Sequence, residues 1–171
     1  MLFAVVAPLQ GLNAQAPANG QRDFDWEIGR WRTHLLLRAP LDSAATWTEY
    51  VGTSVVTRVM DGRANLVELD VSGQAGRIEG ISLRLFNPST QQWSLNFASA
   101  RGGTLFPPVY GAFSAGRGDF VGLDEHEGRK VLVRFVITPV ATDTVRFEQF
   151  YSDDQGKRWI ANWIATDTRL P

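Results

Sequence analysis

Polar side chains lie in the middle of several otherwise apolar stretches, and these are the residues that could do chemistry together. They are Arg84, Asn96, Arg134, Glu148 and Asn162. An unpaired charge in a protein interior is costly, so an inward-facing cluster would have to be mutually hydrogen-bonded. Such a cluster predicts a pocket with a polar floor and an aromatic wall of Trp47, Trp93 and Phe97. The alternative places the polar residues on outer, solvated strand faces, where a charge pair contributes only about 0.2–1 kcal/mol.

The position of a turn bears on this choice. Arg134 and Glu148 are about equally far from Ala141, so a hairpin turn at Ala141 would make them cross-strand neighbours. Together with Arg84 they could then hold or protonate a small acidic substrate. This is the enzyme hypothesis.

Other reaction classes lack the residues that they need. The chain has no cysteine, which excludes disulfides, thiolate nucleophiles and cysteine-ligated metals. It has neither a Ser-His-Asp order nor a Gly-x-Ser-x-Gly elbow, so a serine hydrolase has no support. An Arg-Gly-Gly-Thr stretch at residues 101–104 could suggest a phosphate-binding loop, but no helix follows it. We interpret it instead as a loop at the open end of the β-barrel that is predicted below.

The two histidines do not indicate a metal site. His34 lies among alternating arginines in a predicted strand, either on the surface or, facing inward, as a general base or part of a polar pocket. His126 belongs to the acidic segment 124–127, which we interpret as a solvated hairpin turn. Adjacent residues on a strand do not face one way, so this segment alone would not coordinate an ion. We expect no metal and no cofactor.

One motif near the C-terminus is interpreted as structural. Ser152-x-Asp154-x-Gly156-x-x-Trp159 matches the Asp-box of sialidases and related β-propellers. In this pattern the aspartate caps a turn, the glycine adopts a positive φ and the tryptophan folds under the hairpin. It occurs once, in a chain too short for a propeller, so we predict a hairpin lock and no sialidase activity.

Hydrophobic residues alternate with a period of two from residue 30 onwards, which is typical of β-strands. After the strand that begins there, we expect strands at 46–58, 64–71, 79–86, 92–98, 110–113, 119–123, 130–138, 144–152 and 159–168. A glycine at position 52 indicates a bulge or tight bend. Short connections and the lack of a later helix period favour an all-β fold, a single antiparallel up-and-down barrel of about eight to ten strands.

The first strand is preceded by residues that we predict to form a short helical plug. Asp23 is a plausible N-cap, and Phe24 and Ile28 are spaced for one helical turn before Gly29. We expect this plug, with Trp26 and Trp31, to close one end of the barrel. Any pocket should then open at the other end, near residues 101–108.

The Gly29-x-Trp31 opening resembles the first strand of the calycin superfamily, which includes lipocalins, fatty-acid-binding proteins, avidins and nitrobindins. The resemblance implies that Trp31 packs at the closed end against an Arg or Lys late in the last strand, a role that Arg169 can take. Such a stacked guanidinium contributes about 0.5–2 kcal/mol. Nitrobindins carry haem on a histidine near the C-terminus, and this chain has none after His126.

A closer resemblance covers nearly the whole chain from about residue 24 onwards. The segments 24–31, 82–88 and 147–152, through to Trp163, are similar to a bacterial family of exported domains of unknown function with a calycin-like barrel. The resemblance implies a fold and no particular activity.

Compartment and domain organisation are expected from the N-terminus. Residues 1–16 have an apolar run followed by small polar residues, as in a secretory signal peptide, although a basic n-region is missing. We therefore expect a signal peptide at 1–16, a disordered arm at 17–22, a barrel domain at 23–171, and a periplasmic or secreted protein. A net charge of −1 without basic runs argues against nucleic-acid binding, and the apolar run is too short to span a membrane.

Three functions follow from this reading of the chain. The leading one is non-catalytic binding of a small, partly apolar molecule inside the barrel. The second is the enzyme hypothesis, a decarboxylase- or cyclase-like barrel acting on a small acidic substrate. The third is a structural or interaction domain with a packed interior. The facing of Arg84, Arg134 and Glu148 separates them.

Overall fold

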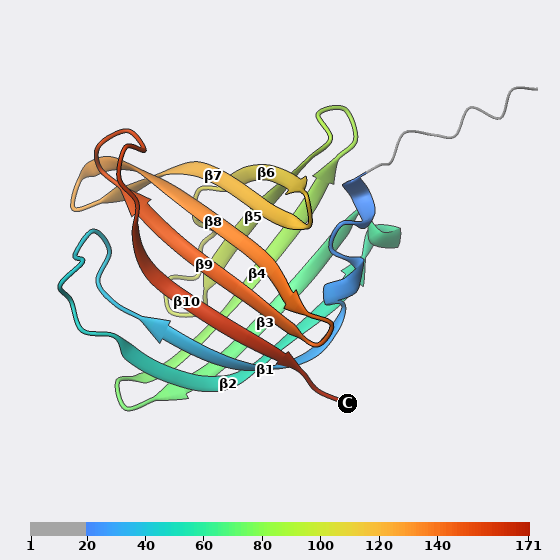
Figure 1. The fold of residues 1–171 in the computed structure, drawn as a ribbon, viewed down its shortest axis with the longest axis horizontal. Coiled ribbons are helices and arrows are strands. Elements are labelled where there is room, and N and C mark those ends of the chain that lie inside the picture. Colours follow the sequence, from blue (N-terminus) through green and yellow to red (C-terminus); the bar gives the residue numbers. More distant parts are fainter. Residues whose placement is uncertain (1–19) are drawn as a thin grey trace, which may run out of the picture.

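The chain forms a single closed barrel of ten antiparallel strands (Figure 1). The computed structural model describes residues 20–171, so the predicted signal peptide and the first half of the predicted arm, residues 17–19, lie outside the described residues. The strands are β1 (Gly29–Leu37), β2 (Thr48–Val59), β3 (Ala64–Gly73), β4 (Gly76–Asn87), β5 (Gln92–Ser99), β6 (Val109–Ser114), β7 (Arg117–His126), β8 (Arg129–Ala141), β9 (Thr144–Ser152) and β10 (Ile160–Arg169). Each strand pairs with the next along the chain, and β1 pairs with β10. The predicted up-and-down barrel is confirmed.

The first strand shows how the sequence separates the inside of the barrel from the outside. Trp31, Thr33 and Leu35 are buried, whereas His34 between them is exposed. This alternation follows from the pleat of a strand, which sends successive side chains to opposite faces. On the outer face, His34 Nε2 is 2.5 Å from Glu49 Oε1, so the surface position considered for this histidine is the observed one.

The N-terminal plug consists of two 3-10 turns. They are η1 (Gly20–Arg22) and η2 (Asp25–Glu27). The Glu27 N–H donates to the Phe24 carbonyl at 3.0 Å, the i to i+3 bond that defines this tighter helix. Phe24 occupies the N-cap position of η2 and no side chain caps the turn, so the predicted Asp23 cap is wrong. The turn stays short because Gly29, at φ 135°, directs the chain into β1 at once.

The two ends of the barrel carry different connections. The plug end holds η1, η2, the C-terminus and the turn η3 (Met60–Gly62) between β2 and β3. The opposite end, here called the mouth end, holds the longer connections at residues 38–47, 100–108 and 153–159. In Figure 1 the blue 3-10 turns and the C-terminus lie together at the right, and the β1–β2 and β9–β10 connections lie at the left. The 101–108 loop is therefore at the end away from the plug.

Gly52 allows β2 to approach β3 closely without a bulge. It lies in register with Val71, and pairing continues unshifted on both sides. A Cβ at Gly52 would lie 2.0 Å from the Asp70 carbonyl oxygen, so only glycine leaves room for that backbone. Of the two predicted explanations, the bulge is wrong, and the glycine is needed for the close approach of the two backbones. The register shifts that do occur are in β10 at 161/163 and in β8 at 139/141.

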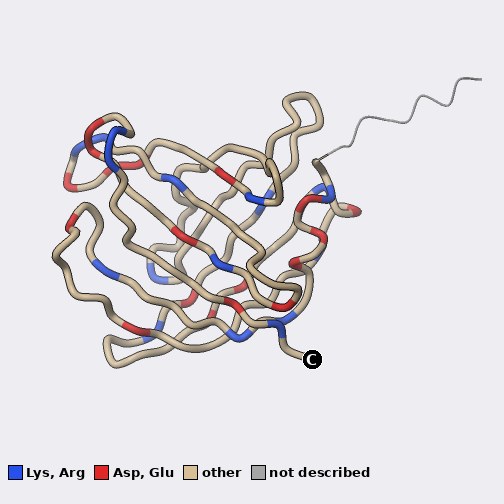
Figure 2. Tube along the Cα trace, in the orientation of Figure 1, with Lys and Arg blue, Asp and Glu red and all other residues tan. Residues whose placement is uncertain are grey.

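The barrel interior contains two hydrophobic clusters. The larger, around Phe24, Trp31 and Phe120, occupies mainly the plug half, and the smaller, around Leu35 and Tyr50, lies toward the mouth end. On the chain trace, residues of both charge signs are interspersed along strands and loops (Figure 2). Within residues 20–171, no helix has the length and apolar character needed to cross a bilayer.

Candidate functional site

A cavity of about 110 Å³ lies inside the barrel between the two clusters. Its lining residues come from the plug and from eight of the strands, and they are Glu27, Trp31, Thr33, Ser54, Val67, Leu69, Ser82, Arg84, Leu95, Phe97, Phe135, Ile137, Val145, Phe147, Gln149, Trp163, Ala165 and Asp167. An apolar cavity with a few convergent polar groups is the usual form of a small-molecule site.

The first element of the polar floor is a buried ion pair. Both terminal nitrogens of Arg84 donate to the Glu27 carboxylate, and the two side chains are only 7% and 10% exposed. The guanidinium also lies 4.3 Å from the centroid of the Phe24 ring. Its Nε is buried with no hydrogen-bond partner among residues 20–171. The positive charge of Arg84 is thus largely compensated by Glu27 of the plug.

The second element is a carboxylate held by hydroxyl groups. The Thr33 hydroxyl donates to Asp167 Oδ1 at 2.5 Å and lies 2.7 Å from the Ser54 hydroxyl. Thr33 has a single hydroxyl proton, so the Ser54 hydroxyl is the donor in the second bond. Burial raises the pKa of Asp167 to about 6, and the nearby Glu27 carboxylate adds to this effect.

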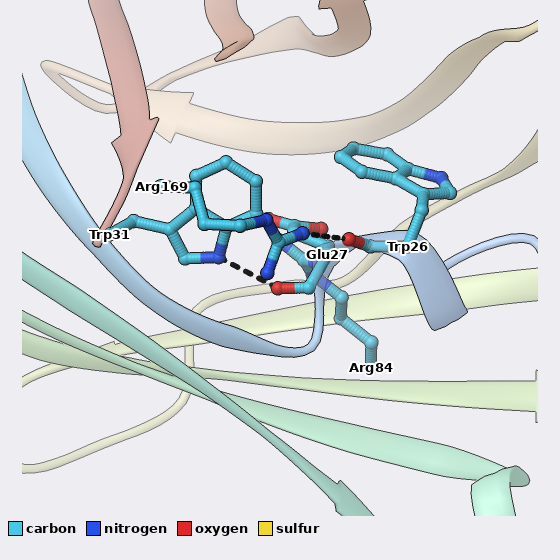
Figure 3. Close-up of polar contacts among 5 residues, drawn as sticks. All are labelled: Trp26, Glu27, Trp31, Arg84 and Arg169. Carbon is cyan, nitrogen blue, oxygen red and sulfur yellow. Dashed lines mark hydrogen bonds and ion pairs between the residues drawn. The ribbon is translucent and has the colours of Figure 1, made fainter. Parts of the chain in front are cut away.

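Stacked and hydrogen-bonded groups seal the cavity at the plug end. The Arg169 guanidinium lies 4.1 Å from the centroid of the Trp31 ring and donates to the Ile28 carbonyl at 3.0 Å and to the Trp26 carbonyl. The Trp31 indole N–H donates to the Glu27 carbonyl at 2.7 Å. Figure 3 shows Trp31, Arg169 and the plug side by side. These contacts place the predicted structural residues Trp26, Gly29, Trp31 and Arg169 together at one end.

The opposite side of the cavity is walled by aromatic rings. Phe97 and Trp163 meet edge to face with ring centroids 6.4 Å apart, and Phe135 and Phe147 do so at 5.2 Å. Phe97 was among the three wall residues predicted, but the other two lie elsewhere. Trp93 is buried in the plug half, where its N–H donates to the Gly20 carbonyl at 2.9 Å. Trp47 lies in the β1–β2 connection under the guanidinium of Arg38, 4.3 Å from its ring centroid.

Of the two arrangements considered for the polar residues, the inward cluster is wrong for all but Arg84, and the outer-face alternative is correct for Arg134 and Glu148. The inward positions of β8 and β9 include Phe135, Ile137 and Phe147, so Arg134 and Glu148 face outward. Arg134 Nε donates to Asp119 Oδ1 at 2.8 Å, and Glu148 pairs with Arg146 at 3.1 Å. The register opposes Arg134 to Phe150 and Glu148 to Val136, so the two are not direct cross-strand partners.

The two asparagines do not line the cavity either. Asn96 is on the outward side of β5, and its amide donates to the Leu83 carbonyl at 3.0 Å. Asn162 is buried at the β10 register shift and accepts a hydrogen bond from Gln149 at 3.2 Å. Asn162 therefore supports a cavity residue without reaching the cavity itself.

The 152–159 turn has the local bonds of a hairpin lock. The Ser152 hydroxyl donates to Asp154 Oδ1 at 2.8 Å, and the Gly156 N–H donates to Ser152 Oγ at 2.9 Å. The Arg158 N–H donates to Asp154 at 2.9 Å, and this bond above all lowers the pKa of that carboxyl. Gly156 has φ 83°, and a Cβ at this position would lie 3.4 Å from the Trp159 ring.

The acidic segment 124–127 is not wholly a turn. Its first three residues end β7, and only Glu127 enters the turn before Gly128. Asp124 accepts a hydrogen bond from the Tyr151 hydroxyl at 2.9 Å. Desolvation and this carboxylate raise the pKa of Tyr151 above its ordinary value. In the described part of the chain, no three His, Asp or Glu side chains are grouped as metal ligands.

The most polar part of the site was not found from sequence. Asp167 and Thr33 lie opposite each other in the β1–β10 register. Asp167 shares the inner face of β10 with buried Ala165, and Thr33 shares the inner face of β1 with buried Leu35. The signal was present in the alternation, because Asp167 continues the Trp163 and Ala165 face of β10. Glu27 lies in the plug, where no strand periodicity applies.

Comparisons with known proteins support the fold. No protein-family model matches the chain, and no curated protein does. Among solved structures, the S-type phycobiliprotein lyase CPES from Guillardia theta is 13% identical, with 91% of this chain and 94% of that one covered and a TM-score of 0.59. The structure of EF1p2_mFAP2b bound to DFHBI is 11% identical over 88% of this chain and 98% of that one, with a TM-score of 0.49. The chain therefore shares the antiparallel barrel fold of that lyase.

Proposed function

We propose that this protein binds a small, partly apolar molecule inside the barrel and does not transform it. The observation that supports this most directly is the cavity of about 110 Å³ with its aromatic wall and polar floor. A cavity of this volume suits a compact ligand, since an engineered apolar cavity of about 150 Å³ in another protein binds benzene. Entry from the mouth end follows from the sealing of the other end by the Trp31 and Arg169 stack.

The residues that motivated the enzyme hypothesis are not assembled. Arg134 and Glu148 lie outside the barrel, and the Arg84 charge is neutralised by Glu27. A packed interaction domain would not need the cavity. Binding is therefore the function that the geometry favours.

We also propose that the protein is exported and belongs to the bacterial family of exported domains that it resembles. The support is the leader-like order of residues 1–16 and the resemblance of segments 24–31, 82–88 and 147–152. Expression of the full chain with and without residues 1–16 tests export: only the first should yield a shortened protein outside the cytoplasm. The same accumulation inside the cell for both would contradict it.

The binding proposal is tested by filling the cavity. Ala165 lines it and is buried, so Ala165→Leu should occupy ligand space. Ala112 lies on the outer face of β6 opposite Asp119, and Ala112→Leu adds the same atoms outside the barrel. Native mass spectrometry and ligand-observed NMR with single-ring compounds measure binding. We expect binding by the wild type and by Ala112→Leu, with weaker binding by Ala165→Leu. Equal binding by all three would place the ligand outside the cavity.

A further inference from the structure

The charges that line the cavity are not balanced. Three charged side chains reach it among the described residues, and they are Glu27, Arg84 and Asp167. Glu27 and Arg84 form a buried pair in which both guanidinium nitrogens face one carboxylate. Asp167 is left without a cation of its own. The cavity therefore carries one net negative charge when Asp167 is ionised.

The protein satisfies only part of the hydrogen-bonding capacity of Asp167. Thr33 is the one side chain that donates to this carboxylate within residues 20–171, and it binds Oδ1. An ionised carboxylate has about four acceptor positions, and desolvation without a compensating partner is costly. Asp167 is also one of the cavity-lining residues, so a ligand in the cavity can reach it.

The register places an apolar chamber beside this carboxylate. Asp167, Ala165 and Trp163 follow one another on the inner face of β10, and Phe147 lies opposite Ala165. Four residues along a strand span about 13 Å, and the small side chain of Ala165 leaves space over that length. Aromatic faces also attract organic cations, by about 0.5–2 kcal/mol each depending on desolvation.

We propose that the ligand is a small protonated amine on a compact apolar or aromatic body. The ammonium group donates to the Asp167 carboxylate, and the body packs over Ala165 against Phe147 and Trp163. This inference rests on the proposed function and narrows it to one chemical class. An anionic ligand would meet the uncompensated carboxylate, and Arg84 could not offset it because Arg84 is already paired. A neutral ligand would leave the carboxylate charge desolvated and unbalanced.

Three probes of one shape and different charge test the inference. Benzylamine, benzyl alcohol and benzoate share a ring and carry a cation, a neutral group and an anion. Titrations of wild-type protein by calorimetry or NMR should give the order benzylamine, then benzyl alcohol, then benzoate. Asp167→Asn should weaken benzylamine at least about tenfold, the loss expected for a hydrogen bond to a charged group, and leave benzyl alcohol nearly unchanged. Asp119→Asn, which neutralises an outer-face carboxylate paired with Arg134, should change neither.

The pH dependence gives a second readout that needs no variant. Glu27 and Arg84 are the charged groups that face Asp167 from the plug and from β4, and Arg169 lies two residues along on β10. Benzylamine stays protonated across the range, so its affinity should fall as the pH drops below about 6, where Asp167 takes up its proton. Benzyl alcohol binding should stay nearly constant.

The outcomes separate the two proposals. The amine assignment is overturned if benzyl alcohol binds as tightly as benzylamine, or if the affinity for benzylamine changes with neither Asp167→Asn nor pH. In both cases the cavity remains a binding site. Tighter binding of benzoate overturns it as well. If none of the three probes binds the wild type, the proposed binding function fails together with the inference.

Discussion

The plug end and the cavity use their polar groups in opposite ways. At the plug end, Arg84 is paired with Glu27, and Arg169 is stacked on Trp31 and bonded to two carbonyls. In the cavity, Asp167 has a single side-chain donor and a raised pKa. Polar groups that satisfy one another's hydrogen bonds and charges specify a rigid closure. A buried carboxylate with unfilled acceptor positions instead destabilises the folded state. Natural proteins keep such costs mainly where function requires them.

The largest expected effect comes from removing the stack at the plug end. Trp31 is 1% exposed, so Trp31→Ala should lower the free energy of unfolding by about 3–5 kcal/mol. Trp47→Ala is the matched control, because Trp47 is only partly buried and lies in a connection at the mouth end. Chemical denaturation measures both. Equal losses would show that stability is not concentrated at the plug.

The buried ion pair should be nearly as sensitive, provided that only one partner is removed. Arg84→Met leaves the Glu27 carboxylate buried without its cation, and we expect a loss of about 3 kcal/mol. Adding Glu27→Leu to Arg84→Met should recover most of this, because no unpaired charge then remains.

The outer pair offers the control for this experiment. Arg134→Met removes the partner of Asp119 on the solvated face and should cost less than about 1 kcal/mol. If the double variant Glu27→Leu/Arg84→Met is as unstable as Arg84→Met alone, the two side chains stabilise the protein by their packing rather than by balancing each other's charge.

Neutralising the cavity carboxylate should have the opposite sign. Folded Asp167 keeps its proton up to about pH 6, whereas the unfolded carboxyl loses it near its ordinary pKa of 3.8. The folded state therefore binds more protons between these values, and wild-type stability falls as the pH rises from about 4 to about 6. Asp167→Asn lacks this loss and should be about 3 kcal/mol more stable at pH 7, with little difference at pH 4.

Denaturation of wild type and Asp167→Asn across this range isolates the group, since other titrations cancel in the difference. A variant that is less stable at pH 7 would show that Asp167 is compensated in a way that the Thr33 contact does not account for.

The alternation of side chains was enough to predict the barrel but not the site. Most strand positions follow from periodicity, and the approach of Arg169 to Trp31 was implied by the resemblance of the Gly-x-Trp opening to calycins. The sequence left the facing of Arg134 and Glu148 open, because both faces of their strands carry apolar residues; in the barrel both side chains face outward. Asp167 was missed although it continues the Trp163 and Ala165 face of β10. The register shift lies earlier, between Ala161 and Trp163, and the pairing from Trp163 to Asp167 is regular.

The smallest expected effect on stability lies at the mouth end, and it sharpens the contrast with the plug. Phe106 in the 100–108 loop stacks on Phe97 with ring centroids 6.0 Å apart, and its N–H donates to the Phe97 carbonyl at 2.8 Å. Phe106 is 47% exposed, so Phe106→Ala removes little buried area and should cost about 0.5–1 kcal/mol. Phe97 lines the cavity, and without its stacking partner the ring gains freedom to move. We therefore expect faster release of a cavity ligand, measured by NMR exchange, with a nearly unchanged denaturation midpoint. A loss of stability as large as that of Trp31→Ala, with unaltered release, would mean that this loop closes the barrel as firmly as the plug does.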